Sequence, residues 1–166
     1  IIVFVNSGDI LTKNALKIIL NKFILDNKID FVFGTVKRHY TKSTILKYGF
    51  NKNKILYNFD FATAHSTGFF MKKSSINKIG GFNTKFKCSA DYDLYFRAII
   101  FHKMNGSSTK KNELVGEVSS GGFSSQISLL DHLFEETKIR IKNKKNLFFI
   151  IIIFFNALLK HFIKKL

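Results

Sequence analysis

The sequence has a single cysteine, Cys88, and contains neither proline nor tryptophan. One cysteine excludes a disulfide within the chain and is typical of a protein in a reducing cytoplasm. Acidic residues are also scarce: 11 Asp and Glu stand against 27 Lys and Arg, giving a formal net charge of +16. The chain is rich in Lys, Asn, Ile and Phe, the amino-acid usage of an AT-rich genome. The positive charge is therefore not by itself proof of a binding surface.

Hydrophobic residues, in contrast, are abundant enough for a folded core. They make up 46% of the 166 residues and include 20 phenylalanines, which argues against a disordered chain. The sequence opens inside the apolar run IIVFV, residues 1–5, which is typical of a buried strand with neighbours in a sheet. We therefore expect an N-terminal portion of a longer protein to precede this sequence.

Segments typical of strands and of helices alternate along the chain. Apolar runs bounded by turn residues predict strands at residues 1–5, 30–36, 67–71 and 113–118. Helical spacing and capping residues predict helices from Thr12 to about residue 27, from Ser74 or Ser75 to Gly80, and at residues 90–101, 127–142 and 147–166. Residues 37–61 are polar and basic, and we expect them to cross one face without regular structure. The alternation predicts an α/β domain with one core.

Two of the few acidic residues stand two positions apart in SADYDLYFRA, residues 89–98. On a helix that begins near Ala90, Asp91 lies in the first turn, where free N–H groups and the helix dipole favour a carboxylate. This structural role is the more frequent one for an isolated Asp-x-Asp pair. The longer stretch GGFNTKFKCSADYDLYFRA, residues 80–98, is more specific, because a helix-ending Gly-Gly pair, an aromatic residue and a short loop precede the acidic pair.

This stretch resembles a segment of the family 2 glycosyltransferases, which have the GT-A fold, a Rossmann-like mixed sheet flanked by helices. The resemblance implies that Asp91 is the catalytic base of inverting sugar transfer, which takes the proton from the acceptor hydroxyl as its oxygen attacks the anomeric carbon. It also implies that Asp93 and Arg97 belong to the substrate-binding region, where they fix the helix and its loop. The family often has Glu before the first Asp, whereas this sequence has Ala90.

The segment VNSGDIL, residues 5–11, has a turn between a strand and a helix as its simplest interpretation. In the family, a DxD motif at this place holds Mg²⁺ or Mn²⁺ on the donor diphosphate, since a hard cation prefers oxygen ligands. The sequence keeps the second aspartate, Asp9, and has Ser7 in place of the first. The resemblance therefore implies Asp9 as the metal ligand, with Ser7 a weaker partner than a carboxylate.

Two further segments follow the order of motifs in the family. AHSTGFFMKKSSINKIGGF, residues 64–82, places His65 where the family borders the acceptor and the diphosphate, so we expect His65 to bind substrate; a structural role is the more frequent one for a lone histidine. GGFSS, residues 121–125, resembles a flap over the nucleotide sugar and makes Gly122 and Ser124 binding candidates. A flexible loop that caps the next helix is an equally good interpretation.

The resemblance covers residues 1–136 and lacks the half of the family domain that binds the nucleotide base. We therefore predict that residues 1–126 are the C-terminal part of a GT-A domain and that residues 127–166 form a helical tail. The apolar run LFFIIIIFF, residues 147–155, is interrupted by Asn156 and is short of the ~20 residues that span a bilayer. Lysines on both sides favour a helix at the surface of an anionic membrane, and the alternative is a helix that covers a sheet face in the intact protein.

Taken together, these patterns predict an inverting glycosyltransferase that uses a nucleotide-diphosphate sugar, Mg²⁺ or Mn²⁺, and a lipid-linked or cell-surface glycan acceptor. We expect it in the cytoplasm, peripheral on the inner face of the plasma membrane. The alternatives are a degenerate transferase, because of Ser7, or a non-catalytic basic module that binds membrane or nucleic acid through lysines such as those of residues 37–54. That segment has a single arginine, Arg38, and matches no recognised nucleic-acid-binding fold, so we expect no nucleic-acid partner.

Overall fold

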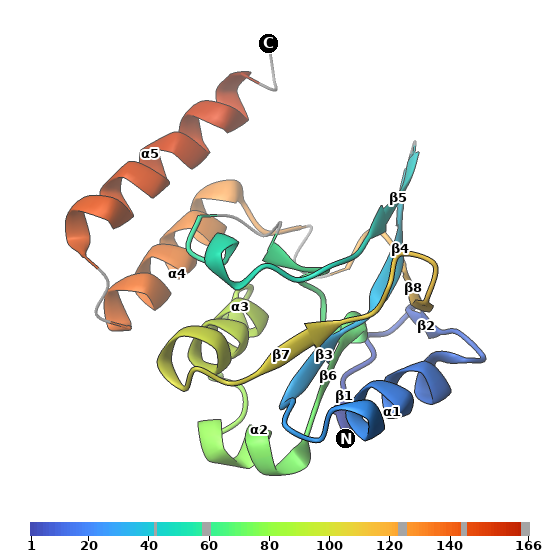
Figure 1. Cartoon of the computed structure of the whole chain (residues 1–166). Coiled ribbons are helices and arrows are strands. Elements are labelled where there is room, and N and C mark those ends of the chain that lie inside the picture. Colours follow the sequence, from blue (N-terminus) through green and yellow to red (C-terminus); the bar gives the residue numbers. More distant parts are fainter. Residues whose placement is uncertain (42, 58–60, 123–125, 144–145, 164–166) are drawn as a thin grey trace.

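The computed structural model describes residues 1–41, 43–57, 61–122, 126–143 and 146–163, with the backbone alone at residues 160–162. These residues form an α/β structure with two mixed sheets (Figure 1). Sheet A has the strand order β1–β6–β3–β7, and sheet B has the order β2–β8–β4–β5. The pairs β3–β7 and β4–β8 are parallel, and the other pairs are antiparallel.

The strands are short, and both sheets draw on segments from most of the chain. The strands of sheet A are Ile2–Val3 (β1), Phe69–Met71 (β6), Phe31–Phe33 (β3) and Gly106–Ser108 (β7). The strands of sheet B are Ile10–Leu11 (β2), Leu114–Val118 (β8), Thr35–Tyr40 (β4) and Ser43–Lys47 (β5). The helices are Ala15–Leu25 (α1), Lys73–Ile79 (α2), Ala90–Phe96 (α3), Leu129–Lys142 (α4) and Leu147–Ile163 (α5).

Gly34 joins the two sheets, because β3 ends just before it and β4 begins just after it. A Cβ atom at this position would lie 2.2 Å from a methyl group of Val115, so the close approach of β8 requires glycine here. The N–H of Gly34 donates to the carbonyl of Gly68 at 2.7 Å, which ties the junction to the start of β6. The apolar segment predicted as one strand is therefore two strands in two sheets.

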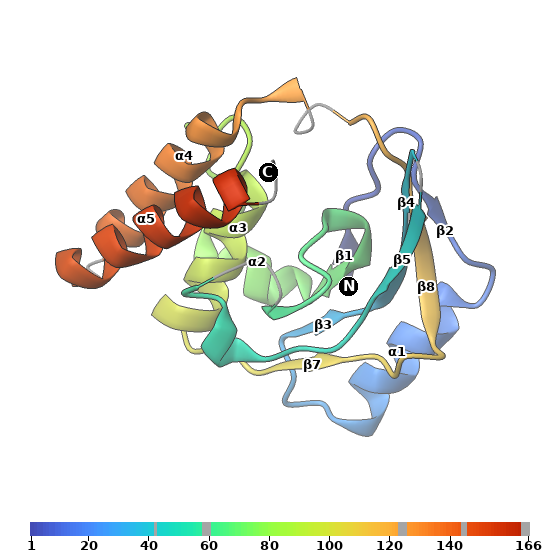
Figure 2. The same cartoon turned by 90° about the horizontal axis from the view of Figure 1, so that it is seen from above.

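Strand β3 separates the two core clusters, since alternate residues of a strand point to opposite faces. Phe31 and Phe33 face an aromatic cluster, in which the Phe33 ring centroid lies 4.9 Å from that of Phe69 and 5.3 Å from that of Tyr95. Val32 faces a second cluster that includes the buried residues of α1. Figure 2 shows α3, α4 and α5 on one side of sheet A and sheet B on the other.

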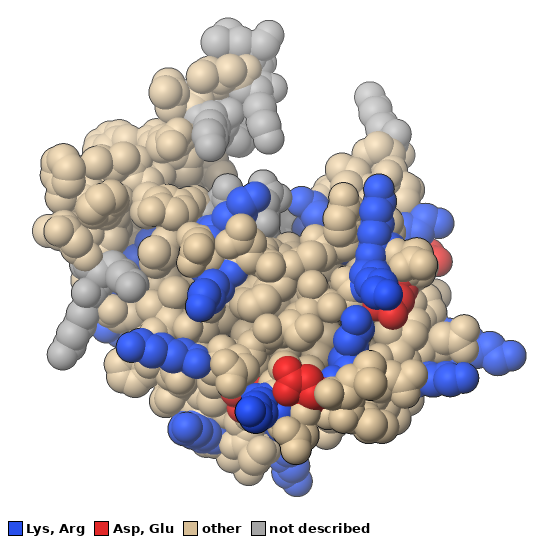
Figure 3. Space-filling view, viewed as in Figure 1, with Lys and Arg blue, Asp and Glu red and all other residues tan. Residues whose placement is uncertain are grey.

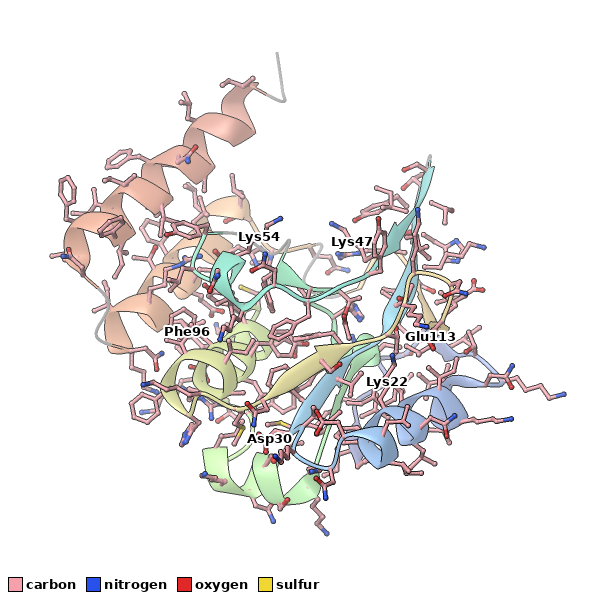
Figure 4. The ribbon with its side chains drawn as sticks, viewed as in Figure 1. Lys22, Asp30, Lys47, Lys54, Phe96 and Glu113 are labelled. Carbon is pink, nitrogen blue, oxygen red and sulfur yellow. The ribbon has the colours of Figure 1, made fainter. Side chains whose placement is uncertain are left out.

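Charged side chains fix several of the connections outside the core. The Asp30 carboxylate, just before β3, accepts hydrogen bonds from the Ser75 hydroxyl of α2 at 2.7 Å and from the N–H of Asn105 at 2.9 Å. Lys22 of α1 and Glu113, just before β8, form an ion pair at 3.4 Å. Figure 4 labels Asp30 above α2 and shows Lys22 and Glu113 near one another. These contacts attach α1 and α2 to the ends of the strands.

The structure confirms a strand within each of the four segments predicted as strands, and it confirms that Gly80 ends α2. Gly80 has a φ of 78°, the left-handed conformation that glycine adopts easily. The Asn6–Asp9 turn is also present, with the Asp9 N–H donating to the Asn6 carbonyl at 3.0 Å. The helices predicted at residues 90–101 and 127–142 are found as α3, which continues as a π-type turn over residues 97–101, and α4.

Three predictions of local structure are wrong. Thr12 does not cap α1, because its hydroxyl donates to the Leu114 carbonyl at 2.8 Å and the helix begins at Ala15. Ser74 and Ser75 lie inside α2, whose N-cap is Lys72. Residues 37–61 are not irregular throughout, since β4 extends to Tyr40 and pairs with β5 as an antiparallel hairpin. Strand β7 was not predicted, because its polar sequence Gly-Ser-Ser has no apolar pattern.

Helix α5 packs on α4 and lies away from both sheets in the two views (Figures 1 and 2). Among the described residues, α5 therefore covers neither sheet. Phe154 of α5 contacts Phe134 of α4, with ring centroids 5.7 Å apart. Among the helices that the structure describes, none is both long and apolar enough to cross a membrane.

Candidate active site

Three segments that are far apart in the sequence meet around the carboxylate of Asp9. The hydroxyl of Thr67 donates to Asp9 Oδ2 at 2.5 Å, and the N–H of Ser119 donates to Oδ1 at 3.0 Å. The Ser119 hydroxyl also donates to the Gly8 carbonyl at 2.6 Å, which fixes the turn before Asp9. The Asp9 side chain is only 4% exposed. We call Asp9, His65, Thr67 and Ser119 the Asp9 cluster.

His65 stands beside this carboxylate as a neutral ring at neutral pH. Its Nδ1 lies 3.8 Å from Asp9 Oδ2 and accepts a hydrogen bond from the Thr67 N–H at 3.3 Å. Burial lowers the pKa of His65; the Asp9 carboxylate raises it and Arg38 lowers it, and the net pKa lies below the ordinary 6.5. Because Nδ1 is an acceptor, Nε2 holds the proton and remains a donor for another partner.

The segment around His65 contains the buried hydroxyl groups of Thr63 and Ser66. In the part of the chain that the structure describes, Thr63 Oγ1 and Ser66 Oγ are buried without a hydrogen-bond partner. Ala64, between them, has a φ of 48°, a strained conformation for a residue with a side chain. Unpaired buried hydroxyls and backbone strain are features that concentrate at functional sites.

Asp91 lies in the first turn of α3, as predicted, and is half-buried. Burial raises the pKa of its carboxyl to about 6. One helical turn later, the buried ring of Tyr95 packs 4.7 Å from Phe69, which directly follows the Thr67 turn. Asp91 is therefore on a helix that packs against the start of β6, directly after the Thr67 turn, although it is not a member of the Asp9 cluster.

Asp93 and Arg97 form a single structural unit with the glycine pair. Arg97 Nε donates to Asp93 Oδ2 at 2.8 Å, and its two terminal nitrogens donate to the carbonyls of Ile79 and, at 2.6 Å, of Gly81. Asp93 is fully buried. The stretch from Gly80 to Arg97 is thus held together by one guanidinium, which fixes the end of α2 against α3. An arginine follows the acidic pair because its planar guanidinium can donate to the Asp93 carboxylate and to two carbonyls at once.

Replacing Arg97 with lysine is expected to lower the free energy of unfolding by about 2 kcal/mol. A lysine keeps the positive charge but cannot bond the Asp93 carboxylate and two carbonyls together, so charge-assisted hydrogen bonds are lost. Urea unfolding of Arg97→Lys measures this change. Arg38→Lys on strand β4 is the matched control, with an expected change within about 0.5 kcal/mol. Equal stability of the two variants would contradict the role assigned to Arg97.

The remaining predicted residues lie near the Asp9 cluster or outside the described structure. Ser7 lies in the exposed turn before Asp9. Gly122 is exposed and follows Gly121, whose φ of 90° requires glycine. Ser124 lies outside the described residues. Thr67 and Ser119 were not selected from the sequence. The only local signal was position: Thr67 begins one predicted strand, and Ser119 directly follows another.

The residues around Asp9 can hold a divalent cation only through one carboxylate, that of Asp9 itself. Within the described ranges, no three His, Cys, Asp or Glu side chains gather as a metal site. Each Asp9 oxygen accepts one hydrogen bond and keeps a second lone pair. Mg²⁺ is commonly held by one or two carboxylates together with substrate phosphates and water, so the donor set is compatible with such an ion.

Comparison of this sequence with models of known protein families finds no match, and comparison with curated proteins finds none either.

Proposed function

We propose that the protein transfers a sugar, with inversion, from a nucleotide-diphosphate donor to a lipid-linked or cell-surface glycan acceptor. Residues 1–126 would then be the C-terminal part of a GT-A domain. The observation that carries the proposal is Asp91, a half-buried carboxyl in the first turn of a helix, with a pKa raised to about 6. A carboxylate of this pKa is suited to accept a proton from a hydroxyl near neutral pH.

In the proposed reaction, Asp91 takes the proton of the acceptor hydroxyl while the acceptor oxygen forms a bond to the anomeric carbon. The bond between that carbon and the donor phosphate oxygen breaks, and the nucleoside diphosphate leaves. A divalent cation held by Asp9 would supply positive charge for this leaving group. The Nε2–H of His65 and the unpaired hydroxyls of Thr63 and Ser66 are suited to bind polar groups of donor or acceptor. Asp93 and Arg97 keep α3 in place.

Donor binding is the most direct test of the proposed function. Saturation-transfer NMR with UDP-, GDP- and dTDP-sugars should detect at least one ligand in the presence of Mn²⁺, and the matching nucleoside monophosphates should bind more weakly. Release of the nucleoside diphosphate in the presence of membrane lipid extract should then report transfer. Failure of the full-length protein to bind any of these donors would refute the proposal.

Asp9→Asn is expected to weaken Mn²⁺ binding by about 100-fold or more, since even the loss of an outer-shell partner costs 10–100-fold. Asparagine keeps the size of the side chain and an acceptor oxygen but removes the negative charge. Paramagnetic broadening of the resonances of Thr67 and Ser119 during Mn²⁺ titration measures the affinity. Asp26→Asn, an exposed carboxylate that caps a turn at 2.9 Å, is the control and should bind as the wild type does. Equal broadening in both variants would show that Asp9 holds no metal.

A second candidate function, a non-catalytic module that binds an anionic membrane, is favoured by α5 and by the net charge of +16. Figure 3 shows basic side chains dispersed over the visible face rather than gathered in one stripe, which does not favour a nucleic-acid site. We propose peripheral attachment to the inner face of the plasma membrane in either case. Variants of Asp9 and Asp91 distinguish the two functions. If the protein is a transferase, these variants should lose sugar transfer and still bind membranes.

A further inference from the structure

The loop that leads into α3, residues 87–89, is held by one carboxylate from a distant helix. Glu135 of α4 accepts hydrogen bonds from the N–H groups of Lys87 at 2.8 Å, Cys88 at 3.0 Å and Ser89 at 2.9 Å. The Cys88 thiol donates to the same carboxylate at 3.1 Å. Four donors thus converge on one side chain that comes 46 to 48 residues later in the sequence.

Glu135 supplies a tether that the start of α3 lacks locally. The N-cap of α3 is Ser89, and its side chain makes no capping hydrogen bond. The first N–H groups of a helix need acceptors from outside the helix, and a carboxylate at this end also interacts favourably with the helix dipole. Glu135 binds the N–H groups of the N-cap and of the two residues before it, and Asp91 follows only two residues after Ser89. The position of the Asp91 turn therefore depends on a contact with α4.

Arg140 of α4 makes separate contacts with the rest of the protein, so the role of Glu135 is local to the loop. The Arg140 guanidinium lies over the Tyr92 ring of α3 at 5.1 Å and donates to the Leu56 carbonyl at 3.2 Å, and Glu136 of the same helix accepts from it at 3.1 Å. None of these contacts involves Glu135. Removing the Glu135 carboxylate should therefore release residues 87–89 without detaching α4.

We infer that Glu135 is a positioning residue for Asp91: by holding residues 87–89 it fixes the start of α3 and keeps the Asp91 carboxyl in its sheltered place. That Asp91 is a catalytic base rests on the proposed function, whereas the tether itself does not. Burial tends to raise the pKa of Glu135, but the hydrogen bonds from residues 87–89 outweigh it and hold the pKa below its ordinary value. The carboxylate is therefore ionised and available as an acceptor at neutral pH.

Two measurements follow the tether without an assay of sugar transfer. Burial, followed by the contact with Glu135, raises the pKa of Cys88 to about 11, and this is the only cysteine in the chain. In Glu135→Ala the thiol should react with iodoacetamide at mildly alkaline pH about 10-fold faster or more, because each unit of pKa changes the thiolate fraction tenfold. The pKa of Asp91, followed by carboxyl NMR, should move from about 6 toward the ordinary 3.8 as water reaches the loosened turn.

Asp131→Asn is the matched control, because it removes one negative charge near Cys88 from the same helix, and the hydrogen bonds of Asp131 within the described residues are to Ser128 and not to the loop 87–89. It should leave both measurements close to those of the wild type. Glu135→Gln keeps one acceptor oxygen for the loop and should lie between the wild type and Glu135→Ala, and it provides the test if the alanine variant does not fold. In the full-length protein, the same order should hold for kcat, with little change in the KM for the donor.

Unchanged Cys88 reactivity and Asp91 pKa in both Glu135 variants would overturn the inference, as would equal effects in Asp131→Asn, which would point to charge alone. If both measurements change as expected and no variant or wild-type protein transfers sugar, the tether stands and the proposed function is wrong. If transfer is present and kcat does not follow the order of the variants, Glu135 does not position the base.

Discussion

Asp91→Asn is expected to lower the turnover of sugar transfer by about 100-fold or more, the range for loss of a general base. Asparagine has nearly the size of aspartate and can occupy the same place at the start of α3, but it cannot take the proton from the acceptor hydroxyl. Because the proposed donor site lies at other residues, the KM for the donor should change little. Steady-state kinetics of the wild-type and variant proteins measure both quantities.

The pH dependence of the wild type gives an independent check of the same assignment. A base must be ionised to act, so kcat/KM should rise with pH through the pKa of Asp91, near 6, and then level off. An ordinary exposed carboxyl would give this rise near 4. A profile without a rise near 6, or one that Asp91→Asn shares, would assign the base to another residue.

Loss of activity in Asp91→Asn must also be separated from loss of fold. Burial disfavours the charged form, so the folded protein holds the Asp91 proton more tightly than the unfolded chain does, and stability decreases as pH rises through about 6. Asparagine carries no charge, so the variant does not have the cost of burying a carboxylate. It should therefore unfold at the same or a higher urea concentration than the wild type at neutral pH. A clearly less stable variant, or turnover within a few-fold of the wild type, would contradict the role of Asp91.

The parts of the fold that sequence predicts well are those specified by nearby residues. Apolar runs found β3, β6 and β8, and Gly80 marked the end of α2 because the left-handed conformation is easy only for glycine. The prediction for Thr12 is wrong because its hydroxyl can either accept a hydrogen bond from a helix N–H or donate one to the Leu114 carbonyl, and only the packed structure decides between them. The β4–β5 hairpin was missed because its exposed strand β5 has no clear alternation of apolar residues.

The candidate site divides in the same way. Asp9 and Asp91 could be selected from short motifs, because a turn after a strand and the first turn of a helix are visible in the local sequence. The partners that orient them are not local. Ser119 reaches Asp9 across 110 positions, and Glu135 reaches the loop before Asp91 across 46 to 48. No spacing rule in a single sequence predicts such contacts, since they depend on how the two sheets and α4 pack.

Deletion of residues 146–166 is expected to move the protein from the membrane pellet to the supernatant. Helix α5 buries Ile150 against the protein, whereas the opposite face exposes large hydrophobic side chains: Phe148 (68%), Ile151 (46%), Ile152 (46%), Phe155 (62%) and Leu159 (60%). An exposed apolar face of this extent needs a partner, and an apolar helix with flanking lysines suits the surface of an anionic membrane. The sequence places Lys142, Lys144 and Lys145 before the helix and Lys164 and Lys165 after it.

The apolar and the electrostatic contributions to this attachment can be measured separately. Binding to phosphatidylcholine vesicles should strengthen when phosphatidylglycerol is included and weaken with added salt, because each lysine near an anionic surface contributes about 1 kcal/mol. Replacing Phe148 and Phe155 with serine keeps every lysine and should still release the protein, since each fully buried aromatic contributes about 2–3 kcal/mol. The matched substitution of Leu16 and Leu20, exposed on α1, leaves α5 intact and should bind as the wild type does. If the truncated protein remains with membranes, or if the intact protein binds neither kind of vesicle, the exposed face of α5 has a protein partner instead.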